Sequence, residues 1–308
     1  MSEHITHIAV YEDACSLIAF SPSFPQVFKT SVSRYPDCGL MASASRGNHL
    51  HALPILARVK DKDQPTEDDL KLMAAALGWI IHRAADLTVK PLYRITGKEY
   101  AVSGIPEYVH EIYHDAATFR YVYDEGRRKS VSPHVHLSAA TLEEAMKSHP
   151  ASKVVDAESV EFLVAGLVHG DLMGLQHFST QAPKDLNSAL NTFFARRQRL
   201  YEDLRIYIQA YQDPDANLYR KFVTDSNYYN EQDELLRLVR SLQKGKAEAS
   251  ISLDAALEQA PKQSIYTQAL HRSYQFLDTA RKYFTDEISA SAAYDALEIF
   301  PKEHRLVN

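Results

Sequence analysis

The sequence predicts an all-α protein. Glycine is scarce, with 10 among 308 residues, and long segments rich in alanine, leucine and tyrosine are separated by few turn clusters. This composition favours helices, because glycine and proline are the residues that most often interrupt them. With 45% hydrophobic and 24% charged residues, the chain is long enough for one large globular domain or two modest ones.

Charge and cysteine content narrow the class of protein further. The formal net charge is -6, which gives no support for a basic nucleic-acid-binding surface. Cys15 and Cys38 fit reduced thiols better than a disulfide framework. The sequence begins without a basic, then apolar, secretory signal and contains no uninterrupted apolar run that predicts a transmembrane segment. We therefore expect a cytoplasmic location.

The first predicted helix covers residues 5–20 and ends before a turn rich in serine and proline. It carries His7 near its start. Asp37 follows Pro36, a pattern that predicts a turn or the beginning of a helix. A Gly-Asn pair then precedes His49 and His51 and indicates another turn. The carboxylate and imidazole groups of these segments are able to meet at one site, to which a helix contributes further side chains.

The central predicted helix covers residues 67–89. Thr66 is a plausible N-cap with Asp69 three residues later, and Pro91 is expected to end the helix. Gly78 costs roughly 1 kcal/mol relative to alanine inside a helix, so we expect another part of the chain to approach it closely. His82 and Asp86 are four residues apart, and this spacing places both side chains on one face of the helix.

The next predicted helix covers residues 106–125, with Pro106 in its first turn. His110 and His114 share one face of it. The segment from His110 to His114 is also an HExxH pattern, in which two histidines bind zinc and Glu111 acts as a base. A metallopeptidase is therefore a weaker alternative, with a third ligand sought among more distant carboxylates. His114 with Asp115 also forms the dipeptide of HD-type phosphohydrolases.

The second half of the chain is predicted to consist of long amphipathic helices, covering residues 184–211, 231–244, 264–283 and 286–297. We expect about ten helices in all, with a soft boundary near residue 180. Residues 1–180 would form a metal-binding helical region, and residues 181–308 would form a helical region that packs on it. The sequence leaves open whether these regions are one continuous domain or two.

The front half collects histidine and carboxylate residues that suit a metal centre. Nitrogen and carboxylate oxygen ligands without thiolates are typical of zinc. Their number exceeds what one tetrahedral ion uses, which indicates two or three zinc ions. The candidate ligands are His7, Asp37, His49 or His51, His82, Asp86, His110 and His114.

The order of these residues resembles the zinc-dependent phospholipase C family, which is related to single-strand-specific zinc nucleases. The shared motifs, which lie between residue 4 and about residue 125, are Thr6-His7, Pro36-Asp37, Gly47-Asn48 with His51, His82-x-x-x-Asp86, and His110 with His114. The resemblance implies an all-helical bundle with additional C-terminal helices.

The resemblance also implies roles for individual residues. It assigns one zinc ion to Asp37, His51, His82 and Asp86, a second to His7 and a shared Asp86, and a third to His110 and His114. His51 is preferred to His49 because the family's histidine follows the Gly-Asn pair by the same spacing. Asp37 would also orient or deprotonate the attacking water and would therefore act as the general base.

The sequence departs from the family at three positions. Secreted members use the N-terminal amine of the processed chain as a ligand, and without a predicted signal peptide we expect His4 to substitute for it or that position to be empty. Lys90 stands where the family often has a histidine, and a protonated lysine cannot bind zinc. His114 stands where the family has a carboxylate. We expect Lys90 to contact a phosphate oxygen directly and to replace part of the charge of a missing ion.

The sequence thus predicts a zinc-dependent phosphodiesterase, because clustered zinc ions activate water and bind the oxygens of a phosphoryl group. A phospholipid head group is one suitable substrate. The alternative from another class is a non-catalytic helical protein that a metal ion stabilises. The oligomeric state and the identity of the substrate are not determined by the sequence.

Overall fold

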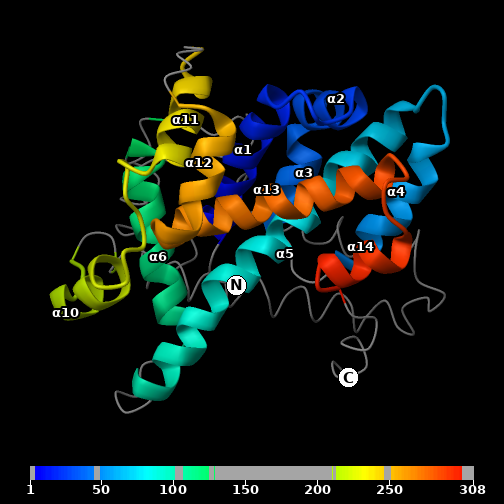
Figure 1. Ribbon diagram of the computed structural model, residues 1–308. Coiled ribbons are helices and arrows are strands. Elements are labelled where there is room, and N and C mark those ends of the chain that lie inside the picture. Colours follow the sequence, from blue (N-terminus) through cyan, green and yellow to red (C-terminus); the bar gives the residue numbers. More distant parts are fainter. Residues whose placement is uncertain are drawn as a thin grey trace, which may run out of the picture.

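The computed structural model describes residues 4–44, 49–100, 107–124, 128, 210, 213–245 and 251–299. Every regular element in these ranges is helical, which confirms the predicted all-α fold (Figure 1). The first part contains α1 (His4–Phe20), α2 (Gln26–Arg34), α3 (Pro36–Ala44), α4 (Ala52–Lys60), α5 (Glu67–Tyr100) and α6 (Glu107–Tyr121). The second contains α10 (Ala216–Tyr219), α11 (Glu234–Gln243), α12 (Leu253–Gln259), α13 (Ile265–Phe284) and α14 (Ala290–Ala296). Single turns η1 (His49–His51), η5 (Arg220–Thr224) and η6 (Ala260–Lys262) link some of them.

Helix α5 is the centre of the fold. It packs against α1, α2, α3, α4 and α13, and α13 crosses it as the long orange helix in the middle of Figure 1. Between Leu70 and Ala85, its alanine, leucine and isoleucine side chains and Trp79 are buried. Removing this apolar surface from water is the main source of stability for such a packing arrangement. Side chains on its buried faces are consequently held in place by neighbours on several sides.

The helix begins as the sequence predicts. The Asp69 carboxylate accepts hydrogen bonds from Thr66 N (2.9 Å) and Thr66 Oγ1 (2.7 Å), while Thr66 Oγ1 accepts one from Asp69 N (3.2 Å). This reciprocal pair is a capping box. Burial raises the pKa of Asp69, but hydrogen bonds from Lys62 and Thr66 outweigh it and lower the pKa to about 2. The carboxylate is therefore ionised at the positive end of the helix dipole.

At Gly78, α3 approaches α5 closely. A Cβ atom added at Gly78 would lie 2.1 Å from the carbonyl oxygen of Gly39, and one added at Gly39 would lie 2.0 Å from the hydroxyl oxygen of Tyr11. Both distances are far shorter than a van der Waals contact allows. The predicted close approach at Gly78 is thus confirmed, and the two glycines allow α3 to fit between α1 and α5.

The predicted end of the central helix is wrong, because α5 continues through Pro91 to Tyr100. A proline inside a helix lacks the N–H that would bond the carbonyl four residues earlier, at Leu87. In this fold the Leu87 carbonyl accepts a hydrogen bond from Arg272 Nη1 of α13 at 3.2 Å. The tertiary contact satisfies the carbonyl that Pro91 leaves without its helical donor, which reduces the cost of continuing the helix.

The second part of the chain packs on the first through a buried ion pair. The Asp13 carboxylate of α1 accepts hydrogen bonds from Arg240 Nη1 (2.5 Å) and Nη2 (2.8 Å) of α11 and from the Tyr266 hydroxyl (2.8 Å) of α13. Burial raises the pKa of Asp13, but the Arg240 guanidinium lowers it by more. Such a bidentate pair fixes the mutual orientation of the three helices. The division into regions 1–180 and 181–308 stays a prediction.

The other predicted helices are found where the structure describes them. Those expected at residues 106–125, 231–244, 264–283 and 286–297 correspond to α6, α11, α13 and α14. The helix expected at residues 184–211 lies almost entirely outside the described residues. The Glu67–Lys90 part of α5 is long and apolar enough to cross a membrane, but 78% of its most apolar stretch is buried inside the fold. Buried core helices commonly share these properties.

Candidate metal centre

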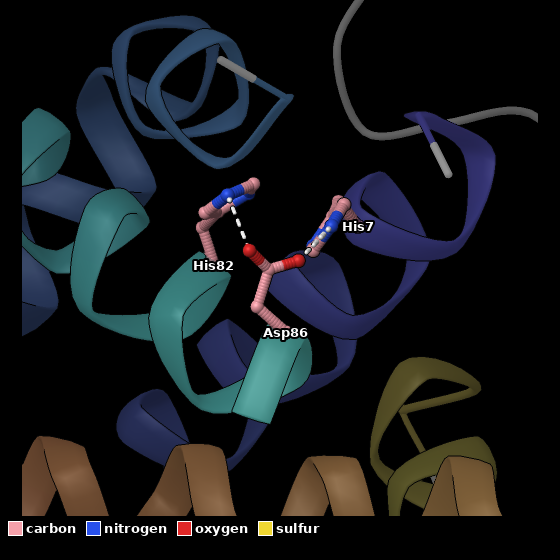
Figure 2. Close-up of side chains that lie close together, drawn as sticks. All are labelled: His7, His82 and Asp86. Carbon is pink, nitrogen blue, oxygen red and sulfur yellow. Dashed lines mark ion pairs between the residues drawn. The ribbon is translucent and has the colours of Figure 1, made fainter. Parts of the chain in front are cut away.

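His82 and Asp86 of α5 meet His7 of α1 at a buried point between the two helices (Figure 2). The Asp86 carboxylate bridges the edges of the two imidazoles, with one oxygen directed toward each ring. Its Oδ1 is 3.3 Å from His7 Nε2, and its Oδ2 is 3.4 Å from His82 Nε2. The two rings are stacked with their centroids 4.1 Å apart. One ligand atom from each of the three residues lies within 4.8 Å of the others, so a single cation is able to contact all three.

Ser43 of α3 determines how His82 is oriented. The Nδ1 atom of His82 lies 2.7 Å from the carbonyl oxygen of Ser43, and the Ser43 hydroxyl donates to the carbonyl of His7 at 3.1 Å. A carbonyl oxygen only accepts hydrogen bonds, so His82 Nδ1 carries the proton. In the neutral imidazole the lone pair is then on Nε2, the atom that faces Asp86.

The protonation states of His82 and Asp86 leave acceptor atoms facing each other. Burial, and next the neighbouring His7, lower the pKa of His82, which favours the neutral ring. Burial raises the pKa of Asp86, but the imidazoles of His82 and His7 lower it by more, to well below its usual range. An ionised carboxylate oxygen and an imidazole lone pair repel each other unless a cation lies between them. Positive charge at this point relieves the repulsion, whether it is a proton on an imidazole, the ammonium of Lys90 or a metal ion.

This donor set fits a divalent metal ion such as zinc. Two imidazole nitrogens and a carboxylate oxygen form a common set of three protein ligands for zinc. A histidine that binds a metal usually donates its other ring N–H to a carboxylate or a backbone carbonyl, as His82 does to Ser43. His7, His82 and Asp86 are thus the residues that would hold the ion.

Lys90 brings a positive charge to the same carboxylate. Its ammonium forms an ion pair with Asp86 Oδ2 from one helical turn further along α5. The side chains of Lys90 and Asp86 are 24% and 15% exposed, so this side of the cluster is the more open one. The expected contact between Lys90 and a phosphate stays a prediction, and Asp86 is the partner that the structure shows for Lys90.

Asp37 and His51 lie on elements around the cluster without being part of it. Asp37 is in the first turn of α3, the helix that also carries Ser43. His51 ends η1 and packs edge-on against Trp79 of α5, with ring centroids 6.2 Å apart. In the described part of the chain, the only group of three or more mutually close metal-binding side chains is the one formed by His7, His82 and Asp86. The roles predicted for Asp37 and His51 stay predictions.

His110 and His114 of α6 have other neighbours. The His114 ring stacks on Tyr228, with centroids 4.0 Å apart, and its Nε2 donates a hydrogen bond to the Phe222 carbonyl at 2.7 Å. The His110 ring lies 3.8 Å from that of Phe222. Burial lowers the pKa of His110 to about 4 and that of His114 to about 3. Neither joins the three-residue cluster among the described residues, so the predicted third zinc ion gains no support.

Asp115 has a structural role that the sequence motifs do not reveal. Its carboxylate accepts hydrogen bonds from Ile5 N (3.2 Å), Thr6 N (2.8 Å) and Thr6 Oγ1 (2.6 Å). It thus caps the first turn of α1 from another helix, next to His7. In this fold, the aspartate of the His114-Asp115 dipeptide therefore serves as a cap for α1.

Two residues near the site, Ser43 and Asp115, were missed by the sequence analysis. Ser43 acts mainly through its backbone carbonyl, and every residue has one, so its residue type carries no signal. Asp115 acts on a helix that is more than a hundred residues away in the chain.

No protein-family model, curated protein or solved structure matches this chain. The resemblance to the zinc-dependent phospholipase C family therefore rests on the motifs in the sequence.

Proposed function

We propose that this protein is a zinc-dependent phosphoester hydrolase whose metal centre includes His7, His82 and Asp86. The observation that carries the proposal is the pairing of two imidazole nitrogens with one carboxylate, together with the hydrogen bond from His82 Nδ1 to Ser43. A bound zinc ion would supply Lewis acidity and would neutralise charge on the oxygens of a phosphoester. The order of the sequence motifs supports a phosphodiester, such as a phospholipid head group, as the substrate.

The residues of the chain have separate tasks in this proposal. Ser43 fixes the tautomer of His82, and Asp86 supplies the negative charge that both imidazoles lack. The buried neighbours of α5 keep bulk water from the imidazoles. Asp37 accepts a proton from the attacking water, as the resemblance implies, and Lys90 contacts an oxygen of the phosphoester. The more exposed edge near Asp86 and Lys90 supports substrate access from that side.

The test is the zinc content of the protein purified without a metal-affinity tag, for the unmodified chain and for His82→Ala and Asp86→Asn. We expect at least one zinc ion per unmodified chain and an affinity at least about 100-fold lower in either variant. The rate at which each protein hydrolyses bis(p-nitrophenyl) phosphate should rise and fall with its zinc content. Folded, unmodified protein that binds no zinc when zinc is supplied would refute the metal centre.

Burial of both histidines favours a second candidate, a protein that a metal ion stabilises without catalysis. A structural zinc site is closed, whereas a catalytic one keeps a position for water or substrate. Zinc binding with no hydrolysis of phosphodiesters, together with a large zinc-dependent rise in Tm, would favour this candidate. Inhibition of zinc-dependent hydrolysis by inorganic phosphate would favour the hydrolase.

A further inference from the structure

Lys90 and His82 contact the same oxygen atom of Asp86. The Lys90 ammonium forms an ion pair with Oδ2, and His82 Nε2 lies 3.4 Å from this atom. The other oxygen, Oδ1, faces His7 Nε2 at 3.3 Å. A cation that contacts both imidazoles and Asp86 therefore lies close to the ammonium of Lys90 or must replace it at Oδ2.

The surroundings allow the ammonium to move away. Lys90 is one of the more exposed residues at the site, with 24% of its side chain accessible, and it has a flexible stem of four carbon atoms. Asp86 is the more buried partner, at 15%, and lies on the same rigid helix as His82. A change of rotamer at Lys90 would free Oδ2 without moving the ligands. By contrast, the imidazole of His82 is held by its hydrogen bond to Ser43.

We propose that Lys90 is an internal cation that competes with the divalent metal ion for Asp86 and thereby lowers the metal affinity of the site. The inference rests on the metal centre of the proposed function and adds a regulatory element to it. Two positive charges within a few ångströms repel each other, and burial strengthens this repulsion. Metal binding then moves Lys90 away from Oδ2, which also frees its ammonium for the oxygen of a phosphoester.

The test compares zinc affinity among Lys90→Met, Lys90→Arg and the unmodified protein, measured by competition with a chromogenic chelator. Lys90→Met removes the charge and keeps most of the side-chain volume, so its affinity should be at least about tenfold higher. Lys90→Arg keeps the charge and is able to pair with the carboxylate through two N–H groups, so its zinc affinity should be no higher than that of the unmodified protein. Zinc should also raise the Tm of Lys90→Met by more than that of the unmodified protein.

Lys282→Met is the matched control. Lys282 forms an ion pair with Asp278 in α13 at 2.8 Å, with the same i, i+4 spacing, so this variant removes one positive charge away from the metal centre. Its zinc affinity should equal that of the unmodified protein. Equal changes in Lys90→Met and Lys282→Met would indicate a general effect of net charge and would overturn the inference.

The outcomes separate the inference from the proposed function. If the unmodified protein binds zinc, His82→Ala loses it, and Lys90→Met binds it no more tightly, then the inference fails and the metal centre stands. If neither the unmodified protein nor Lys90→Met binds zinc although circular dichroism shows both to be folded, then both proposals fail. A zinc affinity that is higher in Lys90→Met, but not in Lys90→Arg or Lys282→Met, supports both the metal centre and the inference.

Discussion

Two pairs of side chains at i, i+4 spacing, one on α5 and one on α6, have different environments in this fold. His82 and Asp86 of α5 present an imidazole nitrogen and a carboxylate oxygen to each other and to His7. His110 and His114 of α6 pack against aromatic rings, and His114 donates a hydrogen bond to a backbone carbonyl. The spacing is the same, but only the first pair presents a carboxylate oxygen and imidazole nitrogens to one point.

The difference shows that the partner of a histidine is more informative than its spacing in the sequence. Burial lowers the pKa of His82 and of His114, so both rings are expected to be neutral near pH 7. His82 uses Nδ1 for its carbonyl partner and directs Nε2 toward Asp86, whereas His114 uses Nε2 itself for the carbonyl. The carbonyl thus holds a different nitrogen in each histidine, and the ring of His114 is also stacked on Tyr228.

The largest expected effect is the loss of stability in His114→Ala, which should leave zinc affinity nearly unchanged. The substitution removes a buried ring that stacks on Tyr228, and it removes one of the hydrogen bonds to the Phe222 carbonyl, which still accepts one from Ser226 Oγ at 2.6 Å. We expect a loss of about 3 kcal/mol in the free energy of unfolding, measured by urea denaturation. Zinc affinity should remain within about threefold of the unmodified protein, given that only cluster ligands should change it by about 100-fold. Loss of zinc in a folded His114→Ala variant would instead place His114 among the metal ligands.

A smaller effect is expected for Gly78→Ala. The new methyl group would lie 2.1 Å from the Gly39 carbonyl oxygen and would push α3, which carries Ser43, away from α5. We expect about 2 kcal/mol of destabilisation and a several-fold lower zinc affinity, because the hydrogen bond from His82 to Ser43 would lengthen. Urea denaturation would measure the loss of stability, and isothermal titration calorimetry would measure the change in zinc affinity.

Gly245→Ala serves as the control for that substitution. Gly245 has a φ of 66°, and among the described residues outside its chain neighbours no atom lies within 4 Å of an added Cβ. The main cost of the variant is therefore that of a left-handed backbone, roughly 1 kcal/mol. Its zinc affinity should not change. If Gly78→Ala kept full zinc affinity while losing stability, the contact between α3 and α5 would have no influence on the metal centre.

The last expected effect, at most comparable to that of Gly78→Ala, is a pH dependence of stability from the α6 pair. The pKa of His114 is lowered to about 3 in the folded protein, so between the unfolded value of about 6.5 and the folded value only the unfolded chain gains a proton. Stability should therefore fall as the pH drops from 7 to 5, with His114 contributing up to about 2 kcal/mol.

His114→Phe tests this contribution, because phenylalanine keeps the ring and does not titrate. Urea denaturation at pH 7 and pH 5, with a chelator present to remove metal effects, should show a smaller loss of stability in this variant. An equal loss in both proteins would mean that His114 does not resist protonation in the fold. His110, with its pKa lowered to about 4, accounts for part of the remaining slope.

Much of the fold could be predicted because its signals are local. Neighbouring residues alone predict the capping box at Thr66 and Asp69 and the apolar body of the central helix. The end of α5 could not be predicted, because the cost of Pro91 depends on Arg272, which lies far along the chain and reaches the Leu87 carbonyl. A local rule about proline thus failed where a tertiary hydrogen bond compensated for it.

The sequence by itself determined that His82 and Asp86 share one face of a helix, since helix geometry depends only on spacing. The resemblance in sequence implied that His7 shares Asp86 with His82. Only the tertiary structure decided that the Ser43 carbonyl orients His82 and that His114 is bound to the Phe222 carbonyl instead. The physical reason is that both partners come from distant segments and are backbone carbonyls. Such carbonyls are present in every residue, so only the packing of helices determines which of them a side chain meets.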